Sequence, residues 1–455
     1  GPNATVLRAR NGGTAQFAGG ATLAAGTTTF VEDGGTLIAG GQLTQASELQ
    51  LMGTGRVAGT ALANSGLVAG SGRIDANLQN LSTGQVRIGT DERLLLRGGG
   101  HLNNGLIDVD GGELEIATGA LTNGTANPAT ATIAARHASL RFTAGITNAG
   151  SIVCSEGTCD IFGNVNNVSS QPTTGRIVIT AASQATFFDD VVNQGTIQVS
   201  AAGLVESTAL FLGSLSGNGV AGSGSVFLEG IVRPGTGIGT GLGTMAFGGD
   251  VSIGSSAILK LELAGTAPGS QFDRFTVQQS LSLSGTLELS LTAGFTPSAG
   301  QSFDLLDWGS RSGTFASIQL PALTAGLSWN ASQLYTAGKL RVFLAGDYNG
   351  NGTVDAADYT VWRDSLGQAG TGLAADGNGN DQIDPDDYTV WKTNFGAMSP
   401  GIGAGSGAGA SASAAVPEPS ALLLALVGLV GAARRRLFGE RSKDVSRSAE
   451  CGRSE

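Results

Sequence analysis

The stretch LNNGLIDV at Leu102–Val109 decides the fold, because close copies of it recur along the chain. Each copy has an apolar residue, an Asn, a Gly two residues later, and then alternating apolar residues. The other clear copies are LANSGLV at 62–68, ITNAGSIV at 146–153 and VVNQGTIQV at 191–199. The intervals between Asn64, Asn103, Asn148 and Asn193 are 39, 45 and 45 residues, and weaker copies lie near Asn80, Asn123 and Asn166. The repeat unit is therefore a coil of about 20–25 residues, near the lower end of the range for solenoid proteins.

Alternation of apolar residues within the copies predicts strands with one face turned inward, as at Leu114 and Ile116 or at Ile197 and Val199. Asn and Gly are expected at the corners, where a positive φ is needed and a large side chain would clash. Each coil can bury its inner face only by stacking on its neighbours. We therefore expect a mainly β protein with a right-handed β-solenoid over residues 1–249. The irregular spacing leaves open the alternative of one or several β-sandwiches.

Composition agrees with an all-β chain. The 455 residues include 74 Gly, and only 13% of them are charged. Gly without a three-residue period excludes collagen, and so much Gly disfavours long helices. The formal net charge of -11 argues against nucleic acid as a partner, because phosphate binding needs a Lys- and Arg-rich surface.

The pattern changes near residue 250. The segments 250–253, 258–263 and 281–291 alternate strictly between apolar and polar residues, which indicates half-buried antiparallel strands. We expect residues 250–345 to form a β-sandwich-like domain that caps the array. The aromatic residues of this region are expected to pack in its core, and the alternative is a carbohydrate-stacking platform. They are Phe272, Phe275, Phe295, Phe303, Trp308, Phe315, Trp329 and Tyr335.

Two twelve-residue loops, 347–358 and 376–387, are related by an offset of 29 residues. Oxygen-bearing side chains stand at positions 1, 3, 5, 9 and 12 of both loops, and a backbone carbonyl is available at position 7. This is the arrangement with which EF-hand loops surround calcium. The expected ligands are Asp347, Asn349, Asn351, Thr353, Asp355 and Asp358 in the first loop, and Asp376, Asn378, Asn380, Gln382, Asp384 and Asp387 in the second.

Asp381 stands at position 6 of the second loop, where Gly normally makes the sharp turn, so this site is expected to be weaker. Val354 and Ile383, at position 8, are expected to pair the two loops through their backbones. Each loop leads into a short helix that carries a Tyr and a Trp three residues apart, on one helix face.

Duplicated loops with only the exiting helix resemble a type I dockerin over residues 346–396. The resemblance implies calcium binding and attachment to a cohesin-like partner, recognised at loop positions 10 and 11 and on the first turns of each helix. Those positions hold Ala356 and Ala357 in one copy and Pro385 and Asp386 in the other, with Arg363 and Lys392 further along. Because the two copies differ, a symmetric two-way binding mode is not expected.

The C-terminal part begins with a Gly-, Ala- and Ser-rich stretch, residues 397–415, which is expected to be a linker. An apolar run at 421–433 follows a Pro-Glu-Pro motif and precedes a basic cluster, and a polar tail fills residues 437–455. The motif residues are Val416, Pro417, Glu418, Pro419, Arg434, Arg435 and Arg436. This order resembles the PEP-CTERM sorting signal, and the resemblance implies export, a membrane helix within 416–436, processing by an exosortase and display at the cell surface. The polar tail departs from the family, whose members usually stop after the arginines.

The repeat array itself is similar to the passenger regions of autotransporter-type and filamentous surface proteins, over roughly residues 1–250. The segment VRPGTGIGT at 232–240 is similar to the Pro-Gly segment near the end of such arrays. The chain starts at Gly1 with no visible signal peptide, so we expect a mature or truncated form.

Solenoids also carry polysaccharide-cleaving enzymes, so the acids and histidines need to be considered as catalytic groups. Asp108 with Asp110, and Glu113 with Glu115, alternate along strands and could hold a cation, but a solvated strand face is the simpler interpretation. His101 and His137 have no recognisable Ser or Cys partner motif, and Asp189-Asp190 reads as a turn. Cys154 and Cys159 could close a small disulfide loop or remain free thiols, and Cys451 has no evident partner.

These patterns predict an exported, surface-sorted structural or adhesive protein whose dockerin-like module binds calcium and a cohesin-like partner. We expect no catalytic activity. The alternative is a polysaccharide-degrading lyase or glycoside hydrolase on a β-solenoid, attached through the dockerin. Extracellular polysaccharide is a further expected partner of either form, and the C-terminal helix is expected to contact the membrane.

Overall fold

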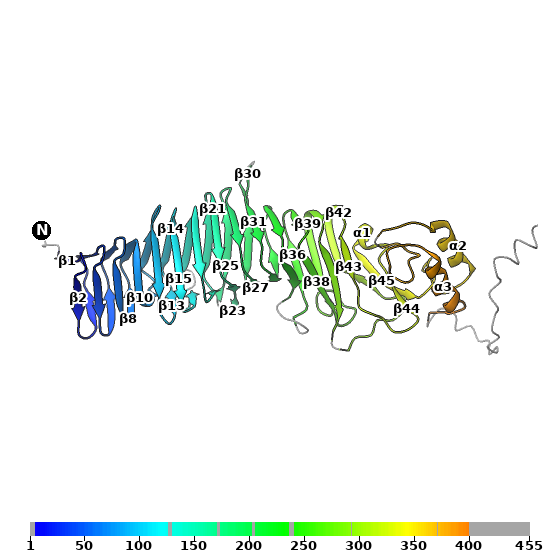
Figure 1. Cartoon of the computed structure of the whole chain (residues 1–455), viewed down its shortest axis with the longest axis horizontal. Coiled ribbons are helices and arrows are strands. Elements are labelled where there is room, and N and C mark those ends of the chain that lie inside the picture. The colour runs from blue at the N-terminus through cyan, green and yellow to red at the C-terminus, as the bar shows by residue number, and fades with distance from the viewer. Residues whose placement is uncertain are drawn as a thin grey trace, which may run out of the picture.

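The computed structural model describes residues 5–125, 130–170, 173–202, 205–235, 241–292, 294–370 and 372–399. These residues form an elongated stack of β-strands, with the helices gathered toward the C-terminal end of the stack (Figure 1). The molecule is mainly β, and its β-solenoid makes about 11 turns over residues 6–253. The alternative of separate β-sandwiches is therefore wrong for this part of the chain.

One strand on each of three faces makes up a typical turn. The first face is a ten-stranded parallel sheet of β1 (Thr5–Ala9), β4 (Thr27–Val31), β7 (Glu48–Leu51), β9 (Leu67–Gly70), β11 (Gln85–Ile88), β14 (Leu106–Asp110), β17 (Thr132–Arg136), β20 (Ser151–Ser155), β25 (Arg176–Thr180) and β28 (Thr196–Val199). The line of this face continues through β33 (Gly219–Val220) and β36 (Thr244–Phe247).

The second face contains β2 (Thr14–Phe17), β5 (Thr36–Ala39), β12 (Arg93–Arg97), β15 (Glu113–Thr118), β18 (Ala138–Phe142), β21 (Thr158–Phe162), β26 (Gln184–Phe187), β31 (Thr208–Phe211), β34 (Ser225–Leu228) and β37 (Val251–Ile253). The third contains β3 (Ala21–Leu23), β6 (Gln42–Gln45), β13 (His101–Asn103), β16 (Leu121–Asn123), β19 (Ile146–Asn148), β22 (Val165–Asn167), β27 (Val191–Asn193), β32 (Leu215–Gly217), β35 (Ile231–Pro234), β38 (Ile258–Leu263), β40 (Thr286–Leu291) and β43 (Ser317–Gln319). Four longer strands turn a corner and pair on two faces: β8 (Arg56–Asn64), β10 (Gly72–Asn80), β39 (Arg274–Leu283) and β42 (Leu306–Gly313).

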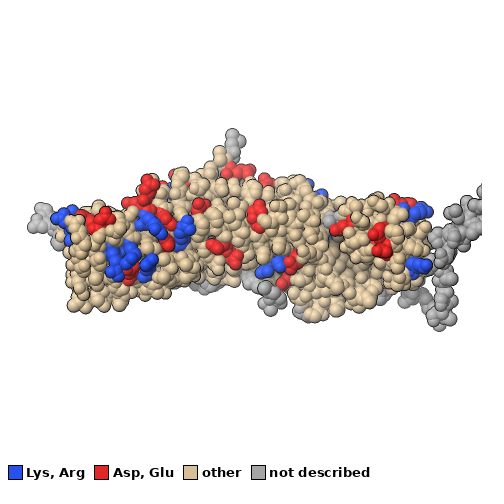
Figure 2. Space-filling model, in the orientation of Figure 1, with Lys and Arg blue, Asp and Glu red and all other residues tan. Residues whose placement is uncertain are grey.

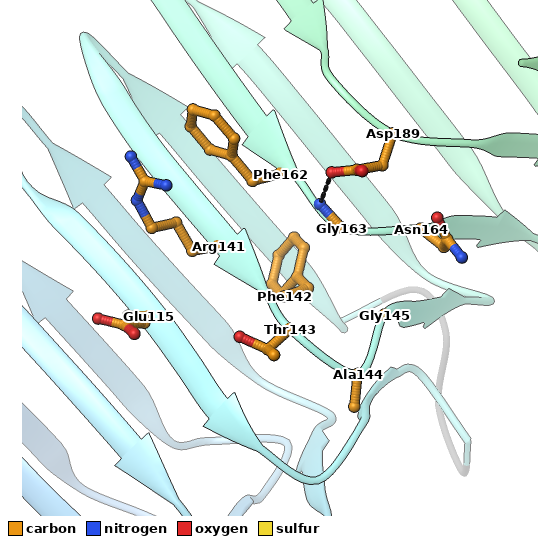
Figure 3. A pocket seen from close by; sticks show the side chains of 10 residues that line it. All are labelled: Glu115, Arg141, Phe142, Thr143, Ala144, Gly145, Phe162, Gly163, Asn164 and Asp189. Carbon is orange, nitrogen blue, oxygen red and sulfur yellow. Dashed lines mark hydrogen bonds between the residues drawn. The ribbon is translucent and has the colours of Figure 1, made fainter. Parts of the chain in front are cut away.

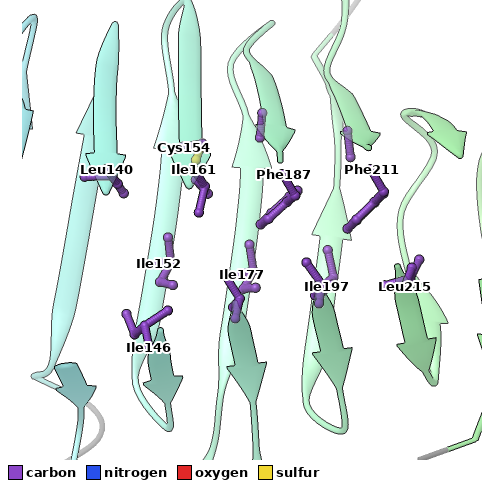
Figure 4. Close-up of a cluster of buried hydrophobic side chains, with 14 of the residues drawn as sticks. Leu140, Ile146, Ile152, Cys154, Ile161, Ile177, Phe187, Ile197, Phe211 and Leu215 are labelled. Carbon is purple, nitrogen blue, oxygen red and sulfur yellow. The ribbon is translucent and has the colours of Figure 1, made fainter. Parts of the chain in front are cut away.

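Parallel, in-register stacking places the same position of each turn above its counterpart. Ile133 pairs with Ile152, Ile152 with Ile177 and Ile177 with Ile197. All four side chains are buried. Figure 4 shows Ile152, Ile177 and Ile197 in the interior together with buried side chains of the other two faces. The alternation of apolar residues in the sequence therefore predicts the core correctly, because a period of two puts every second side chain inside.

A column of buried asparagines runs along the inside of the third face. In all but the last of them, the side-chain amide nitrogen donates to the side-chain oxygen of the next asparagine, 16 to 26 residues along the chain, at 2.7–2.8 Å. The same six also donate to a backbone carbonyl at 3.0–3.2 Å, and the last, Asn193, donates to the carbonyl of Gly219 at 2.7 Å. The column, here called the Asn ladder, consists of Asn64, Asn80, Asn103, Asn123, Asn148, Asn167 and Asn193. The unit of about 20–25 residues inferred from the sequence is confirmed by this spacing.

Of the two reasons expected for the Asn and Gly pattern, the steric clash is confirmed at Gly105 and Gly195, whereas the positive φ is wrong for these residues. The ladder asparagines do not have positive φ, and neither do Gly105 or Gly195. A Cβ on Gly105 would lie 2.2 Å from the carbonyl oxygen of Gly84, and a Cβ on Gly195 would lie 2.2 Å from that of Gly175. The glycines are therefore required by the close approach of the neighbouring turn, and the asparagines by the hydrogen bonds that let a polar side chain be buried.

The expectation of antiparallel strands after residue 250 is wrong for most of that region. β38 pairs in parallel with β40, β39 with β42 and β40 with β43, so the stacking of the solenoid continues to Gln319. An antiparallel sheet is formed only by the shorter strands β41 (Ser302–Asp304), β45 (Lys339–Leu344) and β44 (Leu327–Asn330) within residues 294–370. Strict alternation of apolar and polar residues indicates that one face of a strand is buried, but it does not distinguish parallel from antiparallel pairing. Two small hairpins, β23 (Ser169–Ser170) with β24 (Thr173–Thr174) and β29 (Ala201–Ala202) with β30 (Val205–Glu206), project from the corners.

Core packing of the aromatic residues between 272 and 335 is confirmed. Phe272, Phe275, Phe303 and Phe315 are buried, and the partly buried aromatics pack against the same core. Those partly buried residues are Phe295, Trp308, Trp329 and Tyr335.

The chain ends its described part in a small module with its own core. It contains α2 (Ala356–Ser365) and α3 (Pro385–Asn394), and a shorter helix, α1 (Leu334–Ala337), precedes it. The module lies against the end of the solenoid, where the Phe343 ring fills the space beside Gly350 so closely that a Cβ there would lie 2.8 Å from the ring. Leu344, the last residue of β45, packs on the module core. The module and the solenoid therefore share a packed contact.

Candidate functional site

The first loop of the module folds around its own carboxylates. Oδ1 of Asp347 accepts a hydrogen bond from the amide of Asn351 at 3.0 Å, and Oδ2 accepts from Gly352 at 2.9 Å. Asp358, eleven residues later, accepts from the amides of Asn349 at 2.9 Å and Asp355 at 2.8 Å. Positions 1 and 12 thus hold the loop closed from opposite ends, and both side chains are buried.

The second loop repeats these contacts. Asp376 accepts from the amides of Asn380 at 3.1 Å and Asp381 at 2.8 Å, and Asp387 accepts from Asn378 at 3.1 Å and Asp384 at 2.8 Å. Position 6 keeps a left-handed backbone, with φ of 61° at Asp381 where Gly352 of the first loop has 86°. The Asp therefore takes the turn conformation that a Gly adopts without strain, and the loop is not opened by it.

The acidic groups of each loop oppose one another electrostatically. Burial raises the pKa of Asp347, and the neighbouring charge of Asp358 raises it further. Burial likewise raises the pKa of Asp376, with an added contribution from Asp387. The pKa of Asp358 is raised by burial as well. Each loop therefore holds its first and last carboxylates close together at an energetic cost, and a bound cation would relieve that cost.

Oxygens of the remaining positions serve local turns. The side-chain oxygens of Asn349 and Asn378 accept from the amide two residues on, and so do those of Asn351 and Asn380, whose donors are Thr353 and Gln382. Asp355 and Asp384 cap α2 and α3, and each forms a reciprocal capping box with the position-12 residue. Within the described residues no group of three or more His, Cys, Asp or Glu side chains is gathered as in a metal centre. The expected ligand set draws on amide and backbone oxygens as well as on carboxylates.

The two loop-helix units are joined by reciprocal contacts. Nε1 of Trp362 donates to the carbonyl of Asp384 at 2.8 Å, and Nε1 of Trp391 donates to the carbonyl of Asp355 at 2.8 Å. Tyr359 packs beside Trp391 with ring centroids 5.3 Å apart, and Tyr388 packs beside Trp362 at 5.2 Å. The expectation that each Tyr shares a helix face with its Trp is confirmed, and these faces meet across an approximate twofold relation.

Position 8 pairs differently from the expectation. The amide of Val354 donates to the carbonyl of Ala397 at 2.9 Å, and the amide of Ile383 donates to Gln368 at 2.9 Å. Each loop therefore pairs with the segment that follows the helix of the other unit, and not with the other loop. Ser399 also donates to Gly352 at 2.8 Å, so residues 397–399 belong to the module and not to the linker.

The acids singled out on the solenoid are engaged by arginines. Arg136 contacts Asp108 at 2.6 Å and Asp110 at 3.2 Å. Arg93 contacts Glu113 at 3.4 Å and also Glu115. Basic and acidic side chains intermingle on the visible face of the array (Figure 2). These pairs fit a solvated strand face better than a cation site, because the guanidinium already occupies the place between the two carboxylates.

The two histidines lie apart in different settings. His101 occupies a core position, where its Nδ1 accepts from the amide of Leu78 at 3.1 Å, and burial lowers its pKa. His137 lies at an exposed corner with φ of 47°. Asp189 and Asp190 lie at the corner between β26 and β27, as expected for a turn, and they accept from the amides of Gly163 and Ser214 in the neighbouring coils.

A buried acid that the sequence pattern did not single out is Asp273, which follows a loop and precedes β39. Its two oxygens accept from the amides of Gly243 at 2.8 Å and Glu262 at 3.0 Å. Burial raises its pKa to about 7. It borders a hollow of about 170 Å³ that also contains Glu288, whose carboxylate contacts Lys260 at 2.8 Å. The sequence around an isolated Asp does not indicate a raised pKa, because here the pKa is raised by burial under strands that are distant in the sequence.

A larger hollow of about 580 Å³ lies on the outer side of the second face (Figure 3). Arg141 and Phe162 extend from neighbouring strands, and the guanidinium lies 3.9 Å from the ring centre. The other side of the Phe162 ring is stacked on Phe188 at 4.1 Å. Both faces of the ring are thus covered, so this hollow does not offer an aromatic face on which a sugar could stack.

The sorting motif lies outside the described residues, as do the polar tail, Cys451 and the greater part of the linker. So does the end of the Pro-Gly segment, at 236–240. Among helices within the described residues, none has both the length and the apolar character needed to cross a membrane.

Comparison with known proteins yields one family match. Residues 415–436 match the model of the PEP-CTERM protein-sorting motif. No curated protein matches the chain. The motif implies processing by exosortase, together with export and sorting to the cell surface.

Proposed function

We propose that this exported, sorted β-solenoid protein is a structural or adhesive component of the cell surface, and that its 346–396 module is a dockerin-like calcium site for a partner such as a cohesin. The observation that carries the proposal is the duplicated loop in which the carboxylates of positions 1 and 12 both accept hydrogen bonds from backbone amides of the same loop. Both loops lead into capped helices that contact each other reciprocally.

Calcium suits the donor set of the two loops, since it takes six to eight oxygens from carboxylates, amides and carbonyls. The holding residues would be the twelve named from the sequence, with Thr353 and Gln382 acting through their backbone carbonyls. The ion would supply positive charge to carboxylates that burial and mutual repulsion now disfavour in their charged form. Asp387 and Asp358 would then hold the loop ends as they do here, through the amides of positions 3 and 9.

A partner would meet the exposed ends of the two helices. Ala356 and Ala357 at the start of α2 are exposed, and so are Pro385 and Asp386 at the start of α3. One surface is small and neutral and the other carries an acid, so the approximate twofold relation of the backbone is not matched by the side chains. We therefore infer that a partner distinguishes the two units and binds through one of them.

The module also holds a defined place, because Phe343 packs closely beside Gly350. A partner bound to the module would be fixed relative to the solenoid, which suits a protein whose role is placement. The enzymatic alternative has less support. Both carboxylate oxygens of Asp273 accept hydrogen bonds from backbone amides, and Glu288 forms a salt bridge with Lys260. These two acids of the 170 Å³ hollow are therefore engaged in structural contacts.

Calcium titration of the full chain by calorimetry tests the proposal. We expect two sites in the unaltered protein, one site in Asp358→Asn and one in Asp387→Asn. Asp364→Asn is the matched control, because Asp364 lies on α2 outside both loops and contacts only Arg363 among the contacts seen here. Absence of any calcium-dependent heat, with the fold intact by circular dichroism, would remove the docking function. A panel of cohesin modules, titrated with and without a chelator, then tests the partner.

A further inference from the structure

Cys154 and Cys159 flank one corner of the solenoid. Cys154 lies near the end of β20 on the first face, and Cys159 near the start of β21 on the second. Glu156 and Gly157 make the corner between them, with φ of 60° and 82°. The two cysteines are thus equally distant from a two-residue turn, and their side chains both point into the core, where Figure 4 draws Cys154 among the buried side chains.

Cys154 and Cys159 are free thiols in the structure, and both are buried, at 0% and 1% exposed. Cys159 is the hydrogen-bonding neighbour that contributes most to raising the pKa of Cys154. Three of the four stacking neighbours are alanines: Cys154 pairs with Ala135, and Cys159 lies between Ala138 and Ala185, whereas the other neighbour of Cys154 is Ile179. The two sulfur atoms therefore lie on the inner side of one corner, in a part of the core with mostly small stacking neighbours.

We propose that Cys154 and Cys159 form a disulfide bond in the exported protein, which closes the corner between the first and second faces. The proposal rests on the export implied by the sorting motif, because disulfides persist in oxidising compartments outside the cytosol. It does not rest on the calcium module. The third cysteine, Cys451, lies on the far side of the sorting motif, so processing there would separate it from Cys154 and Cys159.

The oxidant is a disulfide-bonded thiol compound, such as a dithiol oxidoreductase in its oxidised form. One cysteine loses its proton and its thiolate attacks the oxidant, which forms a mixed disulfide and releases one thiolate from the oxidant. The thiolate of the second cysteine then attacks the sulfur of the first, which forms the Cys154–Cys159 bond and releases the second thiolate of the oxidant. The protein loses two protons and two electrons, and the oxidant's disulfide is reduced to two thiols.

Burial determines when this reaction occurs. The hydrogen bond to Cys159 and burial both raise the pKa of Cys154, so the folded thiol stays protonated and unreactive. Exchange needs a thiolate that an oxidant can reach, so the bond forms before the corner is packed. Once formed, it is protected from reductants by the same burial.

The test uses the full chain, unfolded in guanidinium with a reductant and then refolded in a mixture of reduced and oxidised glutathione. Free thiols are alkylated in denaturant without reduction, and the protein is digested with trypsin. Both cysteines then lie in one peptide, residues 142–176, because no Lys or Arg occurs between Arg141 and Arg176. A glutamate-specific protease cuts this peptide after Glu156, between the two cysteines. We expect the two halves to remain linked until a reductant is added.

Cys451→Ala is the matched control and should leave this linkage unchanged, whereas Cys154→Ala with Cys159→Ala should abolish it. The folded protein should keep the bond under dithiothreitol conditions that reduce it in guanidinium. Recovery of both cysteines of the unaltered chain in alkylated form would overturn the proposal, and so would their linkage to Cys451. These results are read from the unaltered chain, so they do not depend on whether a variant folds, and a failure of calcium binding would not change them.

Discussion

The Asn ladder allows a sharp comparison between two adjacent residues. Asn166 and Asn167 are neighbours on β22, but Asn166 points outward and is exposed whereas Asn167 is buried in the ladder. Asn167 donates to Asn193 at 2.8 Å and to the carbonyl of Thr196 at 3.2 Å, and it accepts from Asn148 at 2.7 Å. Replacing Asn167 with Ala removes three hydrogen bonds in the interior, whereas the same change at Asn166 exchanges one solvated side chain for a smaller one.

The expected magnitude follows from the groups left without a partner. Each buried polar group that loses its hydrogen bond costs about 1–3 kcal/mol. Asn148 keeps its second bond, to the carbonyl of Arg176 at 3.1 Å, so the lower end applies to it. The total for Asn167→Ala is therefore at least about 3 kcal/mol, and the cavity adds to it. Asn166→Ala should change stability by no more than about 0.5 kcal/mol.

Hydrogen exchange measured by mass spectrometry suits this prediction, because repeat arrays can open locally without global unfolding. Peptides over β22, β27 and β28 should exchange faster in Asn167→Ala than in the unaltered chain, and the guanidinium midpoint should fall. Asn166→Ala should match the unaltered chain in both measurements. Equal effects of the two substitutions would refute the reasoning, since they would mean that the buried ladder adds nothing beyond the surface side chains.

Further predictions concern the module contact, one buried acid and the sorting signal. Gly350→Ala and Gly379→Ala both place a side chain at a positive φ, but only at residue 350 would the new Cβ meet the Phe343 ring. In thermal unfolding, Gly350→Ala should therefore lower the stability by about 1–3 kcal/mol more than Gly379→Ala does. Because the folded pKa of Asp273 is about 7 and its unfolded value is about 4, the folded state binds the extra proton between these values, and stability should fall as pH rises through this window. The slope in denaturant titrations should reach about 1.4 kcal/mol per pH unit at most, and Asp273→Asn should flatten it. Replacing residues 417–419 with alanine should prevent processing, so that cells carrying the exosortase accumulate the longer chain on immunoblots.

Much of the solenoid could be predicted from the sequence because its repeats are local. The spacing of Asn64, Asn103, Asn148 and Asn193 gives the length of two turns, and the alternation of apolar residues gives the inward positions. The structural role of each repeated residue was harder to predict from the sequence. The asparagines were expected at corners with a positive φ, because the sequence of a single turn does not show that the side chain of the next asparagine will accept a hydrogen bond from the amide. The strands after residue 250 were expected to be antiparallel for a similar reason, since alternation alone does not fix the direction of the partner strand.

In the module too, local features could be predicted from the sequence, whereas contacts between distant segments could not. The loops and the helix face formed by Tyr359 and Trp362 follow from fixed offsets in the sequence, and the structure has them as expected. The pairing of Val354 with Ala397 depends on how two similar units cross over, which neither unit specifies alone. The raised pKa of Asp273 depends on burial by strands that are far away in the sequence, so no local sequence pattern predicts it.

The most direct test of the proposed function is hydrogen exchange of the full chain with and without calcium. The proposal predicts slower exchange in both loops, 347–358 and 376–387, and in α2 and α3, with no change in the solenoid turns before residue 300. It also predicts that Asp387→Asn abolishes the protection of the second loop alone. Unchanged exchange in both loops at millimolar calcium would contradict the proposal, because a loop that closes around an ion cannot leave its amides as accessible as before.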